Sequence, residues 1–117
     1  MAMQSGMFER PPVVIANGID TDLYLNRDKE QVRSHLGIRA RGPVVLLSAG
    51  HVNDERKGIK YSLNALNAIA DLNPFVIVLG TAEPAFFERL DGFDYLAPGY
   101  VSESSQLACY YSAADVL

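Results

Sequence analysis

One polar loop concentrates the residues that could do chemistry. It runs from Gly50 to Gly58 and carries Arg56 and Lys57 immediately before its last glycine. We expect a helix to begin there, and the first amides of a helix lack backbone acceptors and form the positive end of the helix dipole. Two cations at that end are unfavourable unless an anion binds, and glycines let an anion approach the backbone. The loop therefore indicates an anion site, with a diphosphate as the anion.

A purely structural interpretation of this loop stays open. Arg56 and Lys57 follow Asp54 and Glu55 directly, so the four side chains could form ion pairs in a solvated loop. Surface pairs of this kind contribute little to stability. The two interpretations differ in whether Lys57 contributes to binding an anion.

The remaining chemistry-bearing residues are scattered. The chain has no Walker A sequence and no G-x-G-x-x-G, which disfavours simple ATPases and dehydrogenases. Cys109 is the only cysteine, and His35 and His51 are isolated, so no zinc ligand set is predicted. We expect His35 to be an exposed helix residue, Cys109 to be inert, and Glu83 and Glu103 to cap helices or face water. The sequence predicts no catalytic residue and no metal ligand.

Composition limits the class of protein. The chain has 117 residues, 49% of them hydrophobic, and a net charge of −4, which suits one small globular domain without the basic surface of a nucleic-acid-binding protein. We therefore predict no nucleic-acid partner. A single cysteine and the lack of a secretory signal or a long apolar run favour a cytoplasmic protein.

The pattern of apolar runs predicts strands that alternate with helices. Residues 43–49 and 75–79 are almost continuously apolar, as in parallel strands covered on both faces, and residues 59–72 have helical spacing. The further expected elements are a strand at 12–16 closed by an Asn17-Gly18 turn, a helix at 29–36 between Asp28 and Gly37, a helix begun by Pro84, a strand at 95–97, a helix capped by Ser102 with an apolar face that includes Tyr110 and Tyr111, and a strand beginning at Asp115.

This alternation predicts an α/β fold, a Rossmann-like open parallel sheet with flanking helices. We assign residues 12–117 to one partial domain and residues 1–11 to a disordered segment or an expression remnant. Ligands of such sheets bind beyond the carboxyl ends of the strands. Besides the loop at 50–58 and the Asn17-Gly18 turn, the candidate loops are residues 80–83 and 99–102.

Three segments, taken in order, resemble the C-terminal, sugar-nucleotide-binding domain of family 4 glycosyltransferases. They are residues 14–24 (VIANGIDTDLY), 56–58 (RKG) and 111–116 (YSAADV). These enzymes have the GT-B fold, retain the configuration of the sugar and need no metal. The resemblance implies a UDP-sugar or GDP-sugar donor as the ligand, with no further cofactor.

The resemblance also implies roles for individual residues. Lys57 is the expected main ligand of the donor diphosphate, and His51 stands where many members have arginine. The full set of expected donor-binding residues is Lys57, Arg56, Gly58, Gly50, His51, Gly80, Thr81, Tyr100 and Val101, with Tyr100 and Val101 beside the base.

Two parts of the family's active site have no counterpart here. The paired glutamates that contact the donor sugar would lie downstream of Leu117, and the N-terminal acceptor domain is missing. We therefore expect a fragment that binds the donor without transferring the sugar, from a parent enzyme that is cytoplasmic or peripheral to the membrane. The alternative is a non-enzymatic α/β module that forms a homo-oligomer through an exposed sheet edge. A receiver-type module would require an acidic cluster at the end of the first strand, which the sequence lacks.

Overall fold

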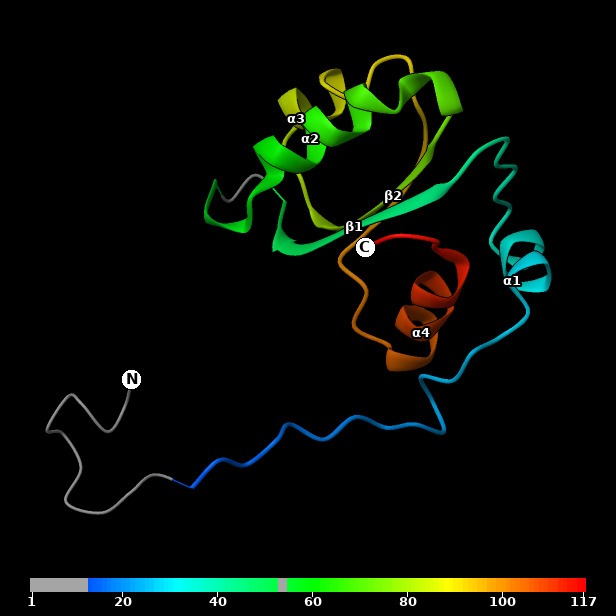
Figure 1. Ribbon diagram of the computed structural model, residues 1–117, viewed down its shortest axis with the longest axis vertical. Coiled ribbons are helices and arrows are strands. Elements are labelled where there is room, and N and C mark those ends of the chain that lie inside the picture. Colours follow the sequence, from blue (N-terminus) through cyan, green and yellow to red (C-terminus); the bar gives the residue numbers. More distant parts are fainter. Residues whose placement is uncertain (1–12, 53–54) are drawn as a thin grey trace, which may run out of the picture.

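A three-stranded parallel sheet forms the centre of the molecule (Figure 1). The computed structural model describes residues 13–52 and 55–117. The strands are β1 (Val44–His51), β2 (Phe75–Thr81) and β3 (Asp94–Gly99), in the order β1-β2-β3. The expected α/β fold with an open parallel sheet is thus confirmed.

The central strand β2 has a continuous apolar sequence because both of its faces are buried. Val76, Ile77, Val78 and Leu79 are all buried, because helices cover both faces of the sheet. Phe75 is paired with Val44 of β1 on one side and with Asp94 of β3 on the other. A strand enclosed in this way has no polar face, so its sequence does not alternate.

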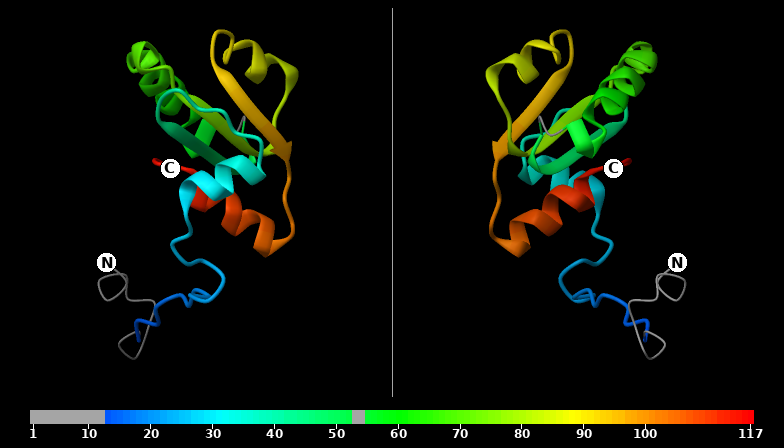
Figure 2. Two further views of the ribbon diagram at one scale, coloured as in Figure 1. Left: turned by 90° about the vertical axis from the view of Figure 1, so that its right-hand side faces the viewer. Right: turned by 90° about the vertical axis from the view of Figure 1, so that its left-hand side faces the viewer.

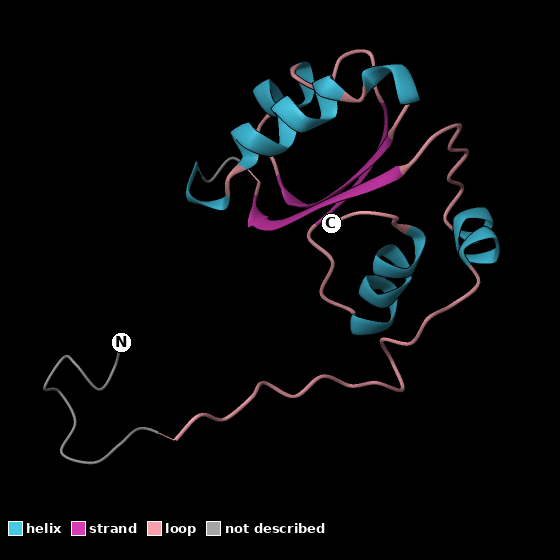
Figure 3. Ribbon diagram, in the orientation of Figure 1, coloured by secondary structure: helices cyan, strands magenta, loops and turns pink. Residues whose placement is uncertain are grey.

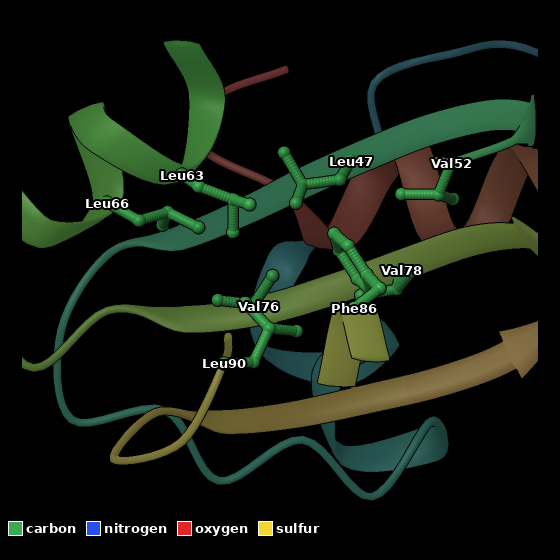
Figure 4. Close-up of a cluster of buried hydrophobic side chains, with 8 residues drawn as sticks. All are labelled: Leu47, Val52, Leu63, Leu66, Val76, Val78, Phe86 and Leu90. Atoms are coloured by element: carbon green, nitrogen blue, oxygen red, sulfur yellow. The ribbon is translucent and has the colours of Figure 1, made fainter. Parts of the chain in front are cut away.

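Two helices cover each face of the sheet (Figures 2 and 3). On one face lie α2 (Ile59–Ala68) and α3 (Pro84–Glu88), and on the other lie α1 (Lys29–His35) and α4 (Ser104–Ala113). Figure 4 shows the first of the two cores, in which α2 and α3 pack on β1 and β2 through Leu47, Val52, Leu63, Leu66, Val76, Val78, Phe86 and Leu90. The second core joins α1 and α4 to the opposite face.

The chain returns to β1 after α4. Val116 forms a parallel bridge with Val45, and its carbonyl accepts a hydrogen bond from the Leu46 amide at 2.8 Å. Where a strand beginning at Asp115 was expected, the structure has a single parallel bridge at Val116. Because β2 lies on one side of β1 and Val116 on the other, the direction of winding reverses at β1. This reversal is the topological switch point of a doubly wound sheet.

The strand expected at residues 12–16 is wrong for its described part. Residues 13–16 have no regular secondary structure, and Val13, Val14 and Ile15 are 84%, 94% and 86% exposed. Pro12 lies outside the described residues. A run of β-branched residues becomes a strand only where a neighbour completes its hydrogen bonds, and no described strand lies beside this one.

The turn that follows this segment also lies elsewhere than expected. Asn17 and Gly18 have no regular secondary structure and are exposed, whereas the turn follows Asp20 at residues 21–24. The Asp20 carboxylate accepts hydrogen bonds from the amides of Asp22 at 3.1 Å and Leu23 at 3.0 Å, and the Asp20 carbonyl accepts one from the Tyr24 amide at 2.9 Å. Aspartate side chains commonly fix turns by bonding to nearby backbone amides in this way.

The predicted helix caps are confirmed for α1, whereas the predicted cap of α4 is wrong. Asp28 caps α1 by accepting a hydrogen bond from the Gln31 amide at 2.9 Å, and Gly37 follows the helix with a φ of 70°. Ser102, however, is not the cap of α4, because Glu103 occupies that position. The Glu103 carboxylate accepts a hydrogen bond from the Ser105 hydroxyl instead of a backbone amide.

The helix expected over residues 59–72 is present in two pieces. After α2 ends at Ala68, a 3-10 turn (Ala70–Leu72) carries the chain to Asn73, which has a φ of 51°. The left-handed conformation of Asn73 ends the helix before Pro74, as the proline predicts.

Candidate functional site

The carboxyl ends of β1 and β2 approach each other unusually closely. The register of the two strands shifts between Ser48 and His51, and Gly80 has a φ of 115°. A Cβ atom on Gly80 would lie 1.6 Å from the carbonyl oxygen of Ala49. Only glycine fits this position, and its lack of a side chain brings the end of β1 against Thr81.

Hydrogen bonds join these two strand ends. The Thr81 hydroxyl donates to the Gly50 carbonyl at 2.9 Å and lies 2.7 Å from Nδ1 of His51. Since a hydroxyl has one proton, Thr81 must accept from His51, which places the imidazole proton on Nδ1.

The basic loop leads into α2 at the same edge of the sheet. Arg56 and Lys57 belong to a 3-10 turn (Glu55–Lys57), and both are exposed. Gly58 is the N-cap of α2 with a φ of 72°, provides no side-chain cap, and is followed by a first turn without acidic residues. The positive end of this helix thus carries added positive charge.

The alternative pairing within this loop involves residues that lack a description. Asp54 and the side chain of Glu55 lie outside the described part of the chain. In that described part, no ion pair includes Lys57. Both interpretations of the loop, as an anion site and as a solvated network, remain predictions.

The predicted base-binding residues lie after β3. Gly99 ends that strand with a φ of 78°, and the next residue, Tyr100, is 72% exposed. Val101 packs its side chain against the core between α1 and α4. In the part of the chain with described side chains, no side-chain hydrogen bond connects Tyr100 or Lys57 to His51. The structure therefore brings together Gly50, His51, Gly80 and Thr81.

Sequence reasoning missed a hydroxyl pair at the switch point. The hydroxyl of Tyr111 makes a long hydrogen bond of 3.5 Å to the hydroxyl of Ser48 on β1. The ring of Tyr24 meets that of Tyr111 edge-on, with centroids 6.3 Å apart. Tyr110, in contrast, packs into the core as expected for the apolar face of α4. The available signal was Ser48 itself, a polar residue that interrupts an apolar strand shortly before Gly50.

A second charged cluster lies at the amino end of the sheet. Asp115 accepts hydrogen bonds from Lys29 at 2.7 Å, from Arg33 at 2.7 Å and from the Val44 amide at 2.9 Å. Arg33 also donates to the Ala113 carbonyl at 2.9 Å. We call these groups the Asp115 cluster. It fastens α1 and the end of α4 to the start of β1.

The partners of Asp115 determine its protonation. Burial acts to raise the pKa of this carboxyl group, but the hydrogen bonds from Lys29, the Val44 amide and Arg33 outweigh it and lower the pKa from 3.8 to about 2. The group is therefore ionised throughout the neutral range. A carboxylate held by these three donors joins the segments that supply them.

Two further sequence expectations concern His35 and Cys109, which lie away from these clusters. His35 is exposed on α1 as expected, and Cys109 is partly buried against the second core. Within residues 13–52 and 55–117, no group of three or more histidine, cysteine, aspartate or glutamate side chains is placed to hold a metal ion. No helix among those residues is long and apolar enough to cross a membrane.

The fold and these strand ends define a Rossmann-like α/β domain with a switch point beside β1. The sequence matches no protein-family model, and it matches no curated protein. The likeness to family 4 glycosyltransferases consequently rests on the three motifs alone.

Proposed function

We propose that this domain binds the diphosphate of a nucleotide-sugar donor at the carboxyl edge of β1 and β2. The observation that carries the proposal is the doubly wound topology, since ligands of such sheets bind where the winding reverses. The loop that leaves β1 at this place ends in Arg56, Lys57 and an uncapped helix start. Charge, free amides and topology thus favour an anion at one position.

In this proposal Lys57 is the main phosphate ligand. Its ammonium group attracts the diphosphate, Arg56 adds positive charge, and the first amides of α2 beyond Gly58 donate hydrogen bonds. Gly80 lets the backbones of β1 and β2 meet without an intervening side chain, and Gly50 leaves the exposed end of β1 without one. Thr81 contributes indirectly, by holding the ring of His51.

The resemblance extends the proposal beyond binding. The whole protein would be a cytoplasmic or membrane-peripheral glycosyltransferase that moves the sugar from UDP or GDP to an acceptor with retention of configuration and without a metal. The base of the donor would lie against Tyr100 and the backbone of Val101. The acceptor would bind a separate N-terminal domain.

Calorimetric titration of the chain with UDP and GDP tests the phosphate assignment. We expect at least one of the two to bind, and uridine or guanosine without phosphates to bind at least about tenfold more weakly, because the diphosphate supplies the main attraction. Lys57→Ala should weaken the nucleotide by a similar factor.

Arg41→Ala is the matched control for the lost charge. Arg41 is exposed and lies before β1, at the opposite edge of the sheet. This variant should bind like the unchanged protein. Equal losses of nucleotide affinity in the two variants would mean that only the net charge of the protein matters. Unchanged affinity in Lys57→Ala would refute the phosphate site.

A further inference from the structure

The edge strand β3 is only partly covered on the face that it turns toward α3. That helix has five residues and spans about 7.5 Å, whereas the six residues of β3 span about 20 Å. The ring of Phe87 on α3 stacks on the ring of Tyr95 on β3, with centroids 5.5 Å apart and an angle of 24° between the planes. Tyr95 nevertheless remains 44% exposed. Figure 2 shows β3 as the outermost strand of the sheet.

A groove results from this incomplete cover. It has a volume of about 740 Å³ and lies between α3, the turn at residues 89–93 and β3. We call it the α3–β3 groove. Phe87, Phe93 and Tyr95 supply its aromatic wall. Clustered aromatic side chains that remain open to solvent are typical of a surface that binds another molecule.

The α3–β3 groove is also acidic. Glu88 and Asp91 line it, and a smaller cavity of about 250 Å³ beside it shares Asp91 and adds Asp94. Among the described residues, no lysine or arginine lines either cavity, and none of these three carboxylates belongs to an ion pair. Arg89, the one basic residue between positions 82 and 100, lies outside both cavities. Carboxylates beside aromatic rings favour a cation as the ligand.

The α3–β3 groove is separate from the other sites of the molecule. Val116 lies beside β1, so that β1 and β2 stand between it and β3. A strand added next to β1 would therefore not cover the groove. None of the residues proposed for the donor lines it either. The groove thus needs a ligand of its own, independent of nucleotide binding.

We propose that the α3–β3 groove docks a basic segment of a partner protein. Arginine suits it best, because a planar guanidinium group pairs with carboxylates such as Glu88 and Asp91 and stacks on an aromatic face such as that of Tyr95. An apolar side chain next to the arginine would cover Phe93. A protein segment fits better than a small cation, since five of the nine lining residues are exposed and so shallow a groove cannot enclose a small ligand.

Fluorescence anisotropy with a labelled probe peptide tests this docking. The probe has eight residues of alternating arginine and leucine with blocked ends, and a second peptide replaces each arginine by citrulline, which keeps the shape and removes the charge. At about 0.15 M salt, where exposed charges are already screened, we expect the arginine peptide to bind saturably with a Kd below about 1 mM. The citrulline peptide should bind at least about tenfold more weakly.

Two groove variants localise the binding. Glu88→Gln combined with Asp91→Asn should weaken the arginine peptide at least about fivefold, because both carboxylates are lost. Tyr95→Leu should weaken it by about two- to fivefold, because leucine keeps an apolar side chain but has no aromatic face for the cation. All three positions are exposed, so circular dichroism of the variants should remain that of the unchanged protein.

Asp22→Asn combined with Glu30→Gln is the matched control for the lost charge. Both residues are exposed and lie before or within α1, on the other face of the sheet. This variant should bind the arginine peptide within about twofold of the unchanged protein, because it leaves the groove intact.

Several outcomes would overturn the proposal. One is the lack of saturable binding, and another is affinity that falls equally, or not at all, in the groove and control variants. N-acetyl-arginine amide that binds as tightly as the peptide would make the groove a site for a small cation. A dimer in sedimentation velocity that the groove variants abolish would make a second copy of the chain the occupant.

Discussion

Two clusters of basic side chains lie at opposite ends of the strands of the same sheet. One lies at the amino ends, here called the amino edge, and the other at the carboxyl ends, here called the carboxyl edge, and their surroundings differ. Lys29 and Arg33 at the amino edge are bound to Asp115, which holds α1 and the end of α4 against β1. Arg56 and Lys57 at the carboxyl edge are exposed at the start of a helix that has no side-chain cap. The comparison teaches that surroundings distinguish a structural cation from a candidate ligand for an anion, since the side-chain chemistry is the same.

If this contrast is right, substitutions in the Asp115 cluster should lower the free energy of unfolding. Substitutions in the basic loop should instead lower the affinity for the nucleotide. The strand ends that support the loop form a third case, because they shape the site through backbone packing. The following experiments separate these three cases.

Gly80→Ala should have the largest effect on stability. The new Cβ atom would meet the Ala49 carbonyl at 1.6 Å, and the φ of 115° is unfavourable for alanine. We expect the free energy of unfolding to fall by about 3 kcal/mol or more in urea denaturation. Gly50→Ala is the neighbouring control, because nothing lies within 4 Å of its Cβ position. Equal stability of the two variants would mean that the strand ends do not pack as closely as described.

Asp115→Asn should come next. The amide can replace the shape of the carboxylate but not its charge-assisted bonds to Lys29 and Arg33. Because the side chain is still 33% exposed, we expect a loss of about 1–2 kcal/mol in urea denaturation rather than the full value for a buried pair. The exposed Asp91→Asn should leave stability unchanged. Unaltered stability in Asp115→Asn would remove the distinction between the two edges.

Acidification should destabilise the protein in the same way as Asp115→Asn, because protonation also removes the charge of Asp115. The folded-state pKa of Asp115 is lowered to about 2, so its carboxylate stabilises the fold fully above 3.8 and loses this effect as the pH falls toward 2. The stability difference between the unchanged chain and Asp115→Asn should therefore shrink over that interval. Urea denaturation at several pH values measures it. A difference that grows on acidification would contradict the lowered pKa.

Lys57→Ala should have little effect on folding. Lys57 is exposed and has no ion pair in the described part of the chain, so we expect the free energy of unfolding to change by less than about 0.5 kcal/mol. Its effect should appear in nucleotide affinity alone. A large loss of stability would favour the solvated ion-pair network as the role of this loop.

His51 should give the smallest effect. The Thr81 hydroxyl lies 2.7 Å from its Nδ1 and holds the ring at the end of β1. We expect His51→Ala to weaken nucleotide binding by about two- to fivefold, because a single polar ring beside the phosphate contributes less than the ammonium group of Lys57. A loss as large as that of Lys57→Ala would make His51 a main ligand, and unchanged affinity would exclude it from the site.

Much of the fold could be predicted because it depends on neighbouring residues. Val76 to Leu79 form a buried strand in any parallel sheet covered on both faces, and Asp28 and Gly37 delimit α1 through short-range bonds. The approach of Gly50 and His51 to Gly80 and Thr81 followed from strand order, since the ends of parallel strands meet at one edge. The strand and the helix ends could be predicted because they depend on residues that are close in sequence.

The parts that could not be predicted depend on distant partners. Whether residues 13–16 form a strand is decided by a neighbouring strand, which the described chain does not provide. The role of Asp115 depends on Lys29, 86 residues away, and the roles of Ser48 and Tyr111 depend on α4 returning to β1. By itself the sequence determined the repeating strand-helix units, the cap of α1 and the charge of the basic loop, because each is local. Only the tertiary structure decided which charges are neutralised and which strand remains unpaired, because both require groups that folding brings together.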